Sequence, residues 1–185
     1  QDTTYYALLG MLAKVGLNKN DINAQAAGPA NVWKLFIAGK ADAMAAVPDW
    51  IAIAQGSGVK VNIFPADDYF KSMAQAILVS DTTIRERPEL VRKLVRATLR
   101  GLKVVMDDPE AASVEYVKAI PQHKGKEKAM EHTFRLYNKY VYPGQKVLGA
   151  MDSERLEALQ KFYVDQGILR RALALSDLYT NEFVE

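Results

Sequence analysis

The sequence predicts an α/β fold followed by a long helical segment. In residues 1–80, apolar stretches of strand length alternate with stretches of helical periodicity, a pattern typical of βαβ units and a parallel sheet. From about residue 83 onward, the periodicity is helical throughout. Residues 1–80 hold six Lys and six Asp but no Arg or Glu, whereas residues 81–150 hold 14 basic and nine acidic side chains. Buried parallel strands would account for the low charge of the first part.

The first part is expected to open with a helix, because Thr3 and Thr4 supply N-cap hydroxyls and Gly16 stands at the position of a C-terminal cap. Four strands are then predicted, over residues 22–26, 43–47, 59–64 and 74–80, with helices over residues 29–38 and 48–55 between them. Pro29 and Pro48 each fall in a first helical turn, where the fixed φ and the missing N–H of proline cost nothing.

The second part is predicted to form helices over residues 88–107, 109–120, 126–139 and 152–166. The first of these carries an apolar stripe that is expected to face the core: Val91, Leu94, Val95, Thr98, Leu102 and Val105. Its basic side chains are interpreted as a solvated face, with a protein-docking surface as the alternative: Arg92, Arg96, Arg100 and Lys103. The apolar helix surface exceeds what four strands can cover. A further sheet is therefore expected before Gln1, or from a second copy in a domain-swapped homodimer.

Composition excludes several classes of protein. The length of 185 residues suits one domain or two small lobes, and 49% hydrophobic content excludes a disordered chain. A net charge of +2 argues against nucleic-acid binding, and no apolar run approaches the roughly 18 residues of a membrane helix. No cysteine is present. His123 and His132 do not share a helix face, so they are interpreted as solvated, and neither a metal nor a cofactor is expected.

Candidate ligand contacts follow the predicted strands, because ligands of open parallel sheets bind near the helix N-termini at the carboxyl ends of the strands. The candidates are Thr3 and Thr4, then Gly28 and Asn31, then Pro48, Asp49 and Trp50. Threonine hydroxyls at a helix N-terminus suit an anion, although an ordinary N-cap has the same pattern. Asp49 and Trp50 could form a polar anchor and an apolar wall, or an early-turn acid and a core side chain.

Catalytic residues are not apparent. Asp67 and Asp68 form a carboxylate pair in a Pro-Ala-Asp-Asp-Tyr turn, where adjacent acids are usually turn formers. No base or nucleophile accompanies them, so the sequence does not predict an enzyme.

Several short motifs, in order along the chain, resemble a known family. They are Gly39-Lys40-Ala41-Asp42-Ala43, Val47-Pro48, Leu78-Val79-Ser80, Ile84 to Val91 (IRERPELV) and Asp108-Pro109-Glu110-Ala111-Ala112. The combination over residues 5–115 resembles the solute-binding proteins of nitrate, sulfonate and taurine type ABC importers. This group includes the thiamine-precursor (NMT1/THI5-like) binding proteins.

The resemblance implies a type II periplasmic-binding-protein fold with a ligand in the cleft between two lobes. On that basis, residues 1–75 are expected to form the second α/β lobe and residues 76–185 a mainly helical return to an incomplete first lobe. The family's second-lobe contacts fall on the seven candidate residues named above. The implied function is periplasmic or lipid-anchored capture of a small organic or inorganic anion, or a related small molecule, by cleft closure, with a membrane permease as partner. A small-molecule enzyme of the same fold and a domain-swapped fragment without its own site remain the alternatives.

Overall fold

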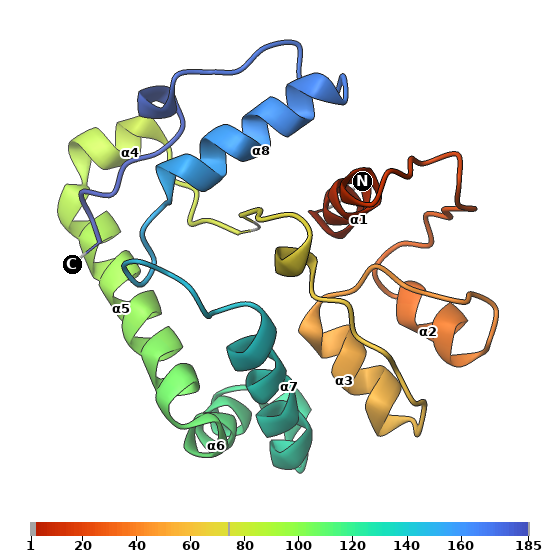
Figure 1. Ribbon diagram of the computed structural model, residues 1–185. Coiled ribbons are helices and arrows are strands. Elements are labelled where there is room, and N and C mark those ends of the chain that lie inside the picture. The colour runs from red at the N-terminus through yellow and green to blue at the C-terminus, as the bar shows by residue number, and fades with distance from the viewer. Residues whose placement is uncertain (1–2, 74, 185) are drawn as a thin grey trace.

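The computed structural model of the protein describes residues 3–73 and 75–184. Its α-helices are α1 (Thr3–Lys14), α2 (Val32–Ile37), α3 (Pro48–Gly56), α4 (Asp81–Glu86), α5 (Pro88–Asp107), α6 (Pro109–Ala119), α7 (Glu127–Tyr140) and α8 (Ser153–Asp165). Short 3₁₀ turns are η1 (Ala66–Asp68), η2 (Pro121–His123) and η3 (Leu175–Asp177). In Figure 1, α1 to α3 lie on one side and α4 to α7 on the other, with α8 across the top. No helix in the described part of the chain is long and apolar enough to cross a membrane.

The predicted α/β fold with a parallel-sheet lobe is wrong, because the structure contains no β-strand within residues 3–73 and 75–184. The segments predicted as strands, 22–26, 43–47, 59–64 and 75–80, are irregular connections between helices, and residue 74 lies outside the described residues. Val59, Val61 and Ile63 are half-buried, and Lys60 and Asn62 between them are exposed. A strand also needs a neighbour that exchanges backbone hydrogen bonds with it. The described segments form no such ladder, so their apolar pattern was insufficient to make a sheet.

The predicted helices are present, with one shifted start. Pro48 occupies the first turn of α3 as expected, and Gly16, at φ +77°, follows α1 as its predicted cap. The helix predicted from Pro29 instead begins at Val32. Residues 28–31 form a hydrogen-bonded turn, in which the Asn31 N–H donates to the Gly28 carbonyl at 3.0 Å, so the helix is delayed by three residues.

A buried cluster on α5 contains Val91, Val95 and Phe183 from the C-terminal segment. Half-buried apolar side chains surround it: Val79, Ile84, Leu99 and Val184. The predicted core stripe is therefore only partly correct, because Leu94 and Thr98 are exposed. The side of α5 that carries Val91 and Val95 is buried because the C-terminal segment and residues 79–84 pack there.

Contacts between segments that are distant in sequence attach α8 to the first part of the chain. The Arg155 guanidinium of α8 donates to both carboxylate oxygens of Asp67, at 3.0 and 3.3 Å. Next to this ion pair, the rings of Phe70 and Phe162 lie 4.6 Å apart between centroids. On α1, the ring of Tyr6 lies 5.2 Å from that of Tyr163. Through these contacts α8 is held against α1 and the segment around η1.

Candidate ligand-binding site

The predicted contact residues lie at the start of three helices. Thr3 and Thr4 are the first residues of α1, and Thr4 is half-buried. Gly28 and Asn31 lie in the exposed turn before α2, where the Asn31 Nδ2 donates to the Ala27 carbonyl at 3.1 Å. The α2 helix has only six residues, so its N-terminus offers a weak dipole.

Pro48, Asp49 and Trp50 form the first turn of α3. Pro48 is buried, Asp49 and Trp50 are half-buried, and the preceding Val47 is extended, with φ −100° and ψ 160°. The helix packs against α2 and against α7. The structure therefore places these three residues in one helical turn of α3, a helix that packs on α7.

Asp49 has a defined partner on α7. The Tyr137 hydroxyl donates a hydrogen bond to the Asp49 Oδ1 at 3.2 Å. Burial, and secondly the Asp49 carboxylate, raise the pKa of Tyr137 well above its ordinary value, so the hydroxyl remains a donor at neutral pH. The Tyr137 ring also stacks on Tyr142, with centroids 5.6 Å apart and planes at 23°. Burial raises the pKa of Tyr142 as well.

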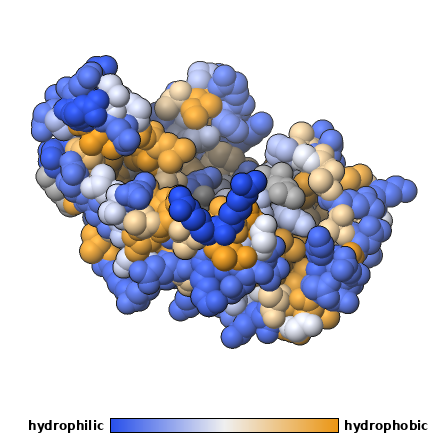
Figure 2. Space-filling view, turned by 90° about the horizontal axis from the view of Figure 1, so that it is seen from above, coloured by the Kyte–Doolittle hydropathy of each residue, from blue (hydrophilic) through white to orange (hydrophobic). Residues whose placement is uncertain are grey.

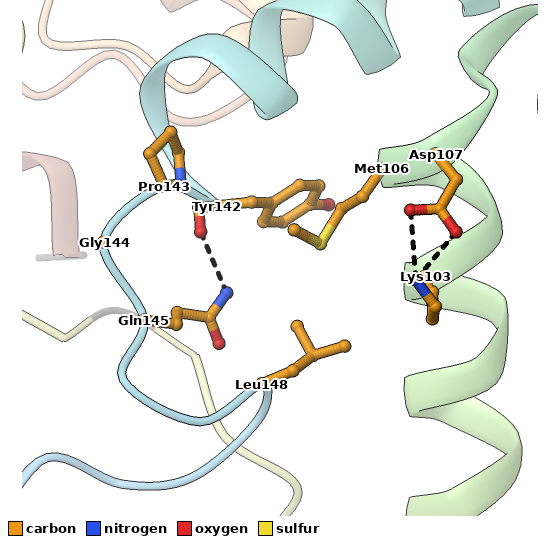
Figure 3. A pocket seen from close by; sticks show the side chains of 8 residues that line it. All are labelled: Lys103, Met106, Asp107, Tyr142, Pro143, Gly144, Gln145 and Leu148. Carbon is orange, nitrogen blue, oxygen red and sulfur yellow. Dashed lines mark hydrogen bonds and ion pairs between the residues drawn. The ribbon is translucent and has the colours of Figure 1, made fainter.

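Tyr142 forms one wall of a pocket of about 340 Å³ between the end of α5 and the loop after α7 (Figure 3). Its lining residues are Lys103, Met106, Asp107, Tyr142, Pro143, Gly144, Gln145 and Leu148. Figure 3 shows the Tyr142 ring directed toward the Met106 side chain. Lys103 is paired with Asp107 at 2.8 Å, and the Gln145 Nε2 donates to the Tyr142 carbonyl at 3.1 Å. The side chains of Lys103, Asp107 and Gln145 are thus engaged within the chain, and the rest of the lining includes the Tyr142 ring, Met106 and Leu148.

A second pocket, of about 360 Å³, adjoins the start of α1. Its lining residues are Tyr5, Tyr6, Leu9, Asn18, Lys19, Asn20, Gln166 and Ile168. Tyr5 and Tyr6 directly follow the predicted contacts Thr3 and Thr4. Their rings lie 5.9 Å apart at an angle of 60°. This pocket combines aromatic rings with amide side chains, which can both donate and accept hydrogen bonds.

Other predicted candidates have structural partners. Asp67 lies in η1, as expected of a turn former, and in addition it pairs with Arg155. His132 is exposed, and its Nε2 lies 2.8 Å from the Gln55 Oε1. The interpretation of His123 as solvated is wrong, because its ring packs 5.4 Å from that of Tyr116 and its Nδ1 is buried. Across residues 3–73 and 75–184, no group of three or more His, Asp or Glu side chains could hold a metal ion.

Tyr137, Tyr142 and Tyr163 were not among the predicted site residues. Aromatic side chains are usually packing residues, and nothing in their spacing distinguishes these three. A signal was nevertheless present in the nine tyrosines of the chain, because a buried tyrosine normally finds a partner for its hydroxyl. Tyr137 does so with Asp49.

Comparison with known proteins identifies the family. Residues 2–112 match the family described as NMT1/THI5 like, and the chain belongs to this family. The chain is also similar to the riboflavin-binding protein RibY of Chloroflexus aurantiacus, with 30% identity over 193 residues. That alignment covers 98% of this chain and 53% of RibY, so the chain spans about half the length of this relative. No solved structure matches the chain.

Proposed function

We propose that this chain is part of an extracytoplasmic solute-binding protein that captures a small molecule and delivers it to the permease of an ABC importer. The observation that carries the proposal is membership of the NMT1/THI5-like family, which is matched over residues 2–112. The similarity to a riboflavin-binding protein supports binding of a small organic molecule.

The proposed ligand is a planar heteroaromatic molecule of the flavin or pyrimidine type. The pocket beside α1 supports this choice, because Tyr5 and Tyr6 offer rings for packing, and Asn18, Asn20 and Gln166 offer amides for ring nitrogens and carbonyls. A small anion such as nitrate or a sulfonate would instead need donors at the helix N-terminus, which Thr3 and Thr4 would provide. The predicted contacts Gly28, Asn31, Pro48, Asp49 and Trp50 remain part of the proposed site.

The proposed mechanism is closure of two lobes, to which residues 1–75 and 76–185 contribute. A ligand that contacts both lobes binds the closed form more tightly and shifts the population toward it. The hydrogen bond from Tyr137 to Asp49 supports this mechanism, because it shows that the first turn of α3 can be held by a residue of the second segment.

Calorimetry on the full-length protein tests the proposal. Riboflavin, an aminopyrimidine, taurine and nitrate are titrated separately. Binding by a heterocycle tighter than roughly 100 μM, about 5.5 kcal/mol, is expected. Tyr5→Ala is expected to weaken it about tenfold, the upper range of one aromatic contact, whereas the matched control Tyr179→Ala, outside the pocket, leaves it unchanged. Binding of taurine or nitrate alone would replace the heterocycle by an anion, and no binding in any class would contradict transport of these solutes.

The enzyme alternative is tested in the same panel by searching for turnover, and for its loss on Asp49→Asn or Asp67→Asn. In the structure, Asp49 accepts a hydrogen bond from Tyr137 and Asp67 is paired with Arg155, so both carboxylates have structural partners.

A further inference from the structure

The pocket beside α1 is lined from two parts of the chain that are far apart in sequence. Six of its lining residues lie between Tyr5 and Asn20, whereas Gln166 and Ile168 come from the end of α8. The pocket beside Tyr142 is lined by residues 103–148 alone. Figure 2 shows the molecule from the side on which α8 lies in Figure 1, and hydrophilic and hydrophobic side chains are interspersed on this face. A ligand in the pocket beside α1 therefore contacts the second part of the chain through the end of α8.

This pocket has an apolar floor and a polar rim. The half-buried lining residues are Tyr5, Tyr6, Leu9 and Ile168, and the exposed ones are Asn18, Lys19, Asn20 and Gln166. A planar ring packs on the half-buried side chains, and its edge meets the rim. Selectivity among such rings then depends on which groups of the rim are free to form hydrogen bonds.

The side chain of Asn18 is committed to the loop after α1. Its backbone N–H and its Nδ2 both donate to the Asp21 Oδ2, at 2.8 and 2.6 Å, and its Oδ1 accepts from the Asn20 N–H at 2.9 Å. Within residues 3–73 and 75–184, the side-chain amides of Asn20 and Gln166 have no hydrogen-bond partner. Each of these two amides can therefore both donate to a ligand and accept from it.

The end of α8 fixes the backbone of Gln166. Its N–H donates to a carbonyl of α8 at 2.9 Å. Gly167 follows at φ +67°, and the Ile168 N–H donates to the Tyr163 carbonyl at 2.8 Å, which is the pattern of a helix C-terminal cap built around a glycine. The Tyr163 ring lies 5.2 Å from the ring of Tyr6, which lines the same pocket. The backbone of Gln166 is thus in place before a ligand arrives, which limits the ordering cost of binding.

We propose that Gln166 is the specificity-determining residue of this pocket and selects rings that carry a donor and an acceptor on adjacent atoms. Its Nε2 donates to the ring acceptor while its Oε1 accepts from the ring N–H, the two-bond pairing that side-chain amides make with heterocyclic bases. The lactam edge of a flavin or a pyrimidinone has this arrangement. The inference rests on the proposed function, because it requires a heteroaromatic ligand in this pocket.

Calorimetry on the full-length protein with riboflavin and 3-methylriboflavin tests the assignment. The two ligands differ by the methyl group that replaces the lactam N–H. A site that pairs with an N–H rejects an analogue without it, because the acceptor in the site is left unpaired. Both ligands are titrated into the parent protein, Gln166→Met and Asn20→Ala. The matched control is Gln122→Met, which changes an exposed glutamine of η2 outside the pocket.

The parent protein and Gln122→Met are expected to bind riboflavin about tenfold more tightly than 3-methylriboflavin, a ratio that corresponds to about 1.4 kcal/mol. Gln166→Met is expected to bind riboflavin about tenfold more weakly than the parent and to bind the two flavins equally. If Gln166→Met weakens both flavins by the same factor and keeps the preference, its role is structural and the proposal is overturned. Loss of the preference in Asn20→Ala alone would also overturn it, by assigning the selection to Asn20.

The same titrations separate this inference from the proposed function. Equal binding of the two flavins by the parent protein would overturn the selection by Gln166 and leave the heteroaromatic ligand in place. No binding of either flavin by the parent protein would contradict a flavin site in this pocket, and the inference would fall with it.

Discussion

The ion pair between Arg155 and Asp67 gives a sharp test of how α8 is attached to the first part of the chain. The guanidinium contacts both carboxylate oxygens, at 3.0 and 3.3 Å, and also donates to the Ser72 carbonyl at 3.3 Å. The side chains are 25% and 46% exposed, so solvent screens the pair. We expect a coupling free energy of about 1 kcal/mol, the upper range for exposed pairs, because the geometry is bidentate. Arg155→Ala should cost about 1 kcal/mol more than Asp67→Asn, because it also removes the hydrogen bond to Ser72.

A double-mutant cycle measured by urea unfolding gives this coupling directly. The matched control is the pair Lys161 and Asp165 on the same helix, which is 2.8 Å apart but 76% and 54% exposed. Its coupling should be about 0.3–0.5 kcal/mol. Raising the salt concentration should reduce both couplings. If the Arg155 and Asp67 variants prove additive, or if the control pair couples more strongly, the assignment of this ion pair as the attachment is wrong.

Three further predictions concern single positions. Burial raises the pKa of the Tyr137 hydroxyl above its ordinary 10.0, so the contribution of this group to stability is complete below about pH 10 and is lost as the pH rises further. In urea unfolding, the free energy of unfolding of Tyr137→Phe should therefore fall less steeply with alkaline pH than that of the parent protein. An equal slope would contradict the burial. Gly149→Ala should cost about 1 kcal/mol more than Gly125→Ala. Both glycines have positive φ, but only at Gly149 would the new Cβ meet the end of the Leu99 side chain, which must shift to make room. Equal melting points would refute this collision. Phe183 is 5% exposed and Phe64 is 67% exposed. Phe183→Ala should therefore lower the free energy of unfolding by about 3–5 kcal/mol, and Phe64→Ala by less than about 1 kcal/mol. Similar chemical denaturation curves for the two variants would show that the C-terminal segment is not anchored.

The helices could be predicted from the sequence because their signals are local. Pro48 and Pro88 mark the starts of α3 and α5, and Asp152 caps α8 by accepting from the N–H groups of Glu154 and Arg155. The sheet was predicted wrongly because pairing depends on a second segment, which the alternation from Val59 to Phe64 cannot reveal. The buried side of α5 was misjudged for a related reason, since Phe183, 88 residues after Val95, decides which face is covered.

The candidate site was partly accessible from the sequence. The positions of Pro48, Asp49 and Trp50 in one helical turn follow from local sequence. The partner of Asp49 does not, because Tyr137 lies 88 residues further along the chain. The same holds for Asp67, whose role as a turn former was predicted and whose ion pair with Arg155 was not.

The long sequence separations have a consequence for biosynthesis. Gln55 contacts His132, and Asp67 contacts Arg155, over 77 and 88 residues. At a synthesis rate of roughly 5–20 residues per second, α3 and η1 are synthesised about 4–18 seconds before these partners. Through that interval the apolar side chains of the first segment have no α7 or α8 to pack against. Chaperone binding to the nascent chain should therefore be strongest after the first segment emerges and decline once α8 has been synthesised.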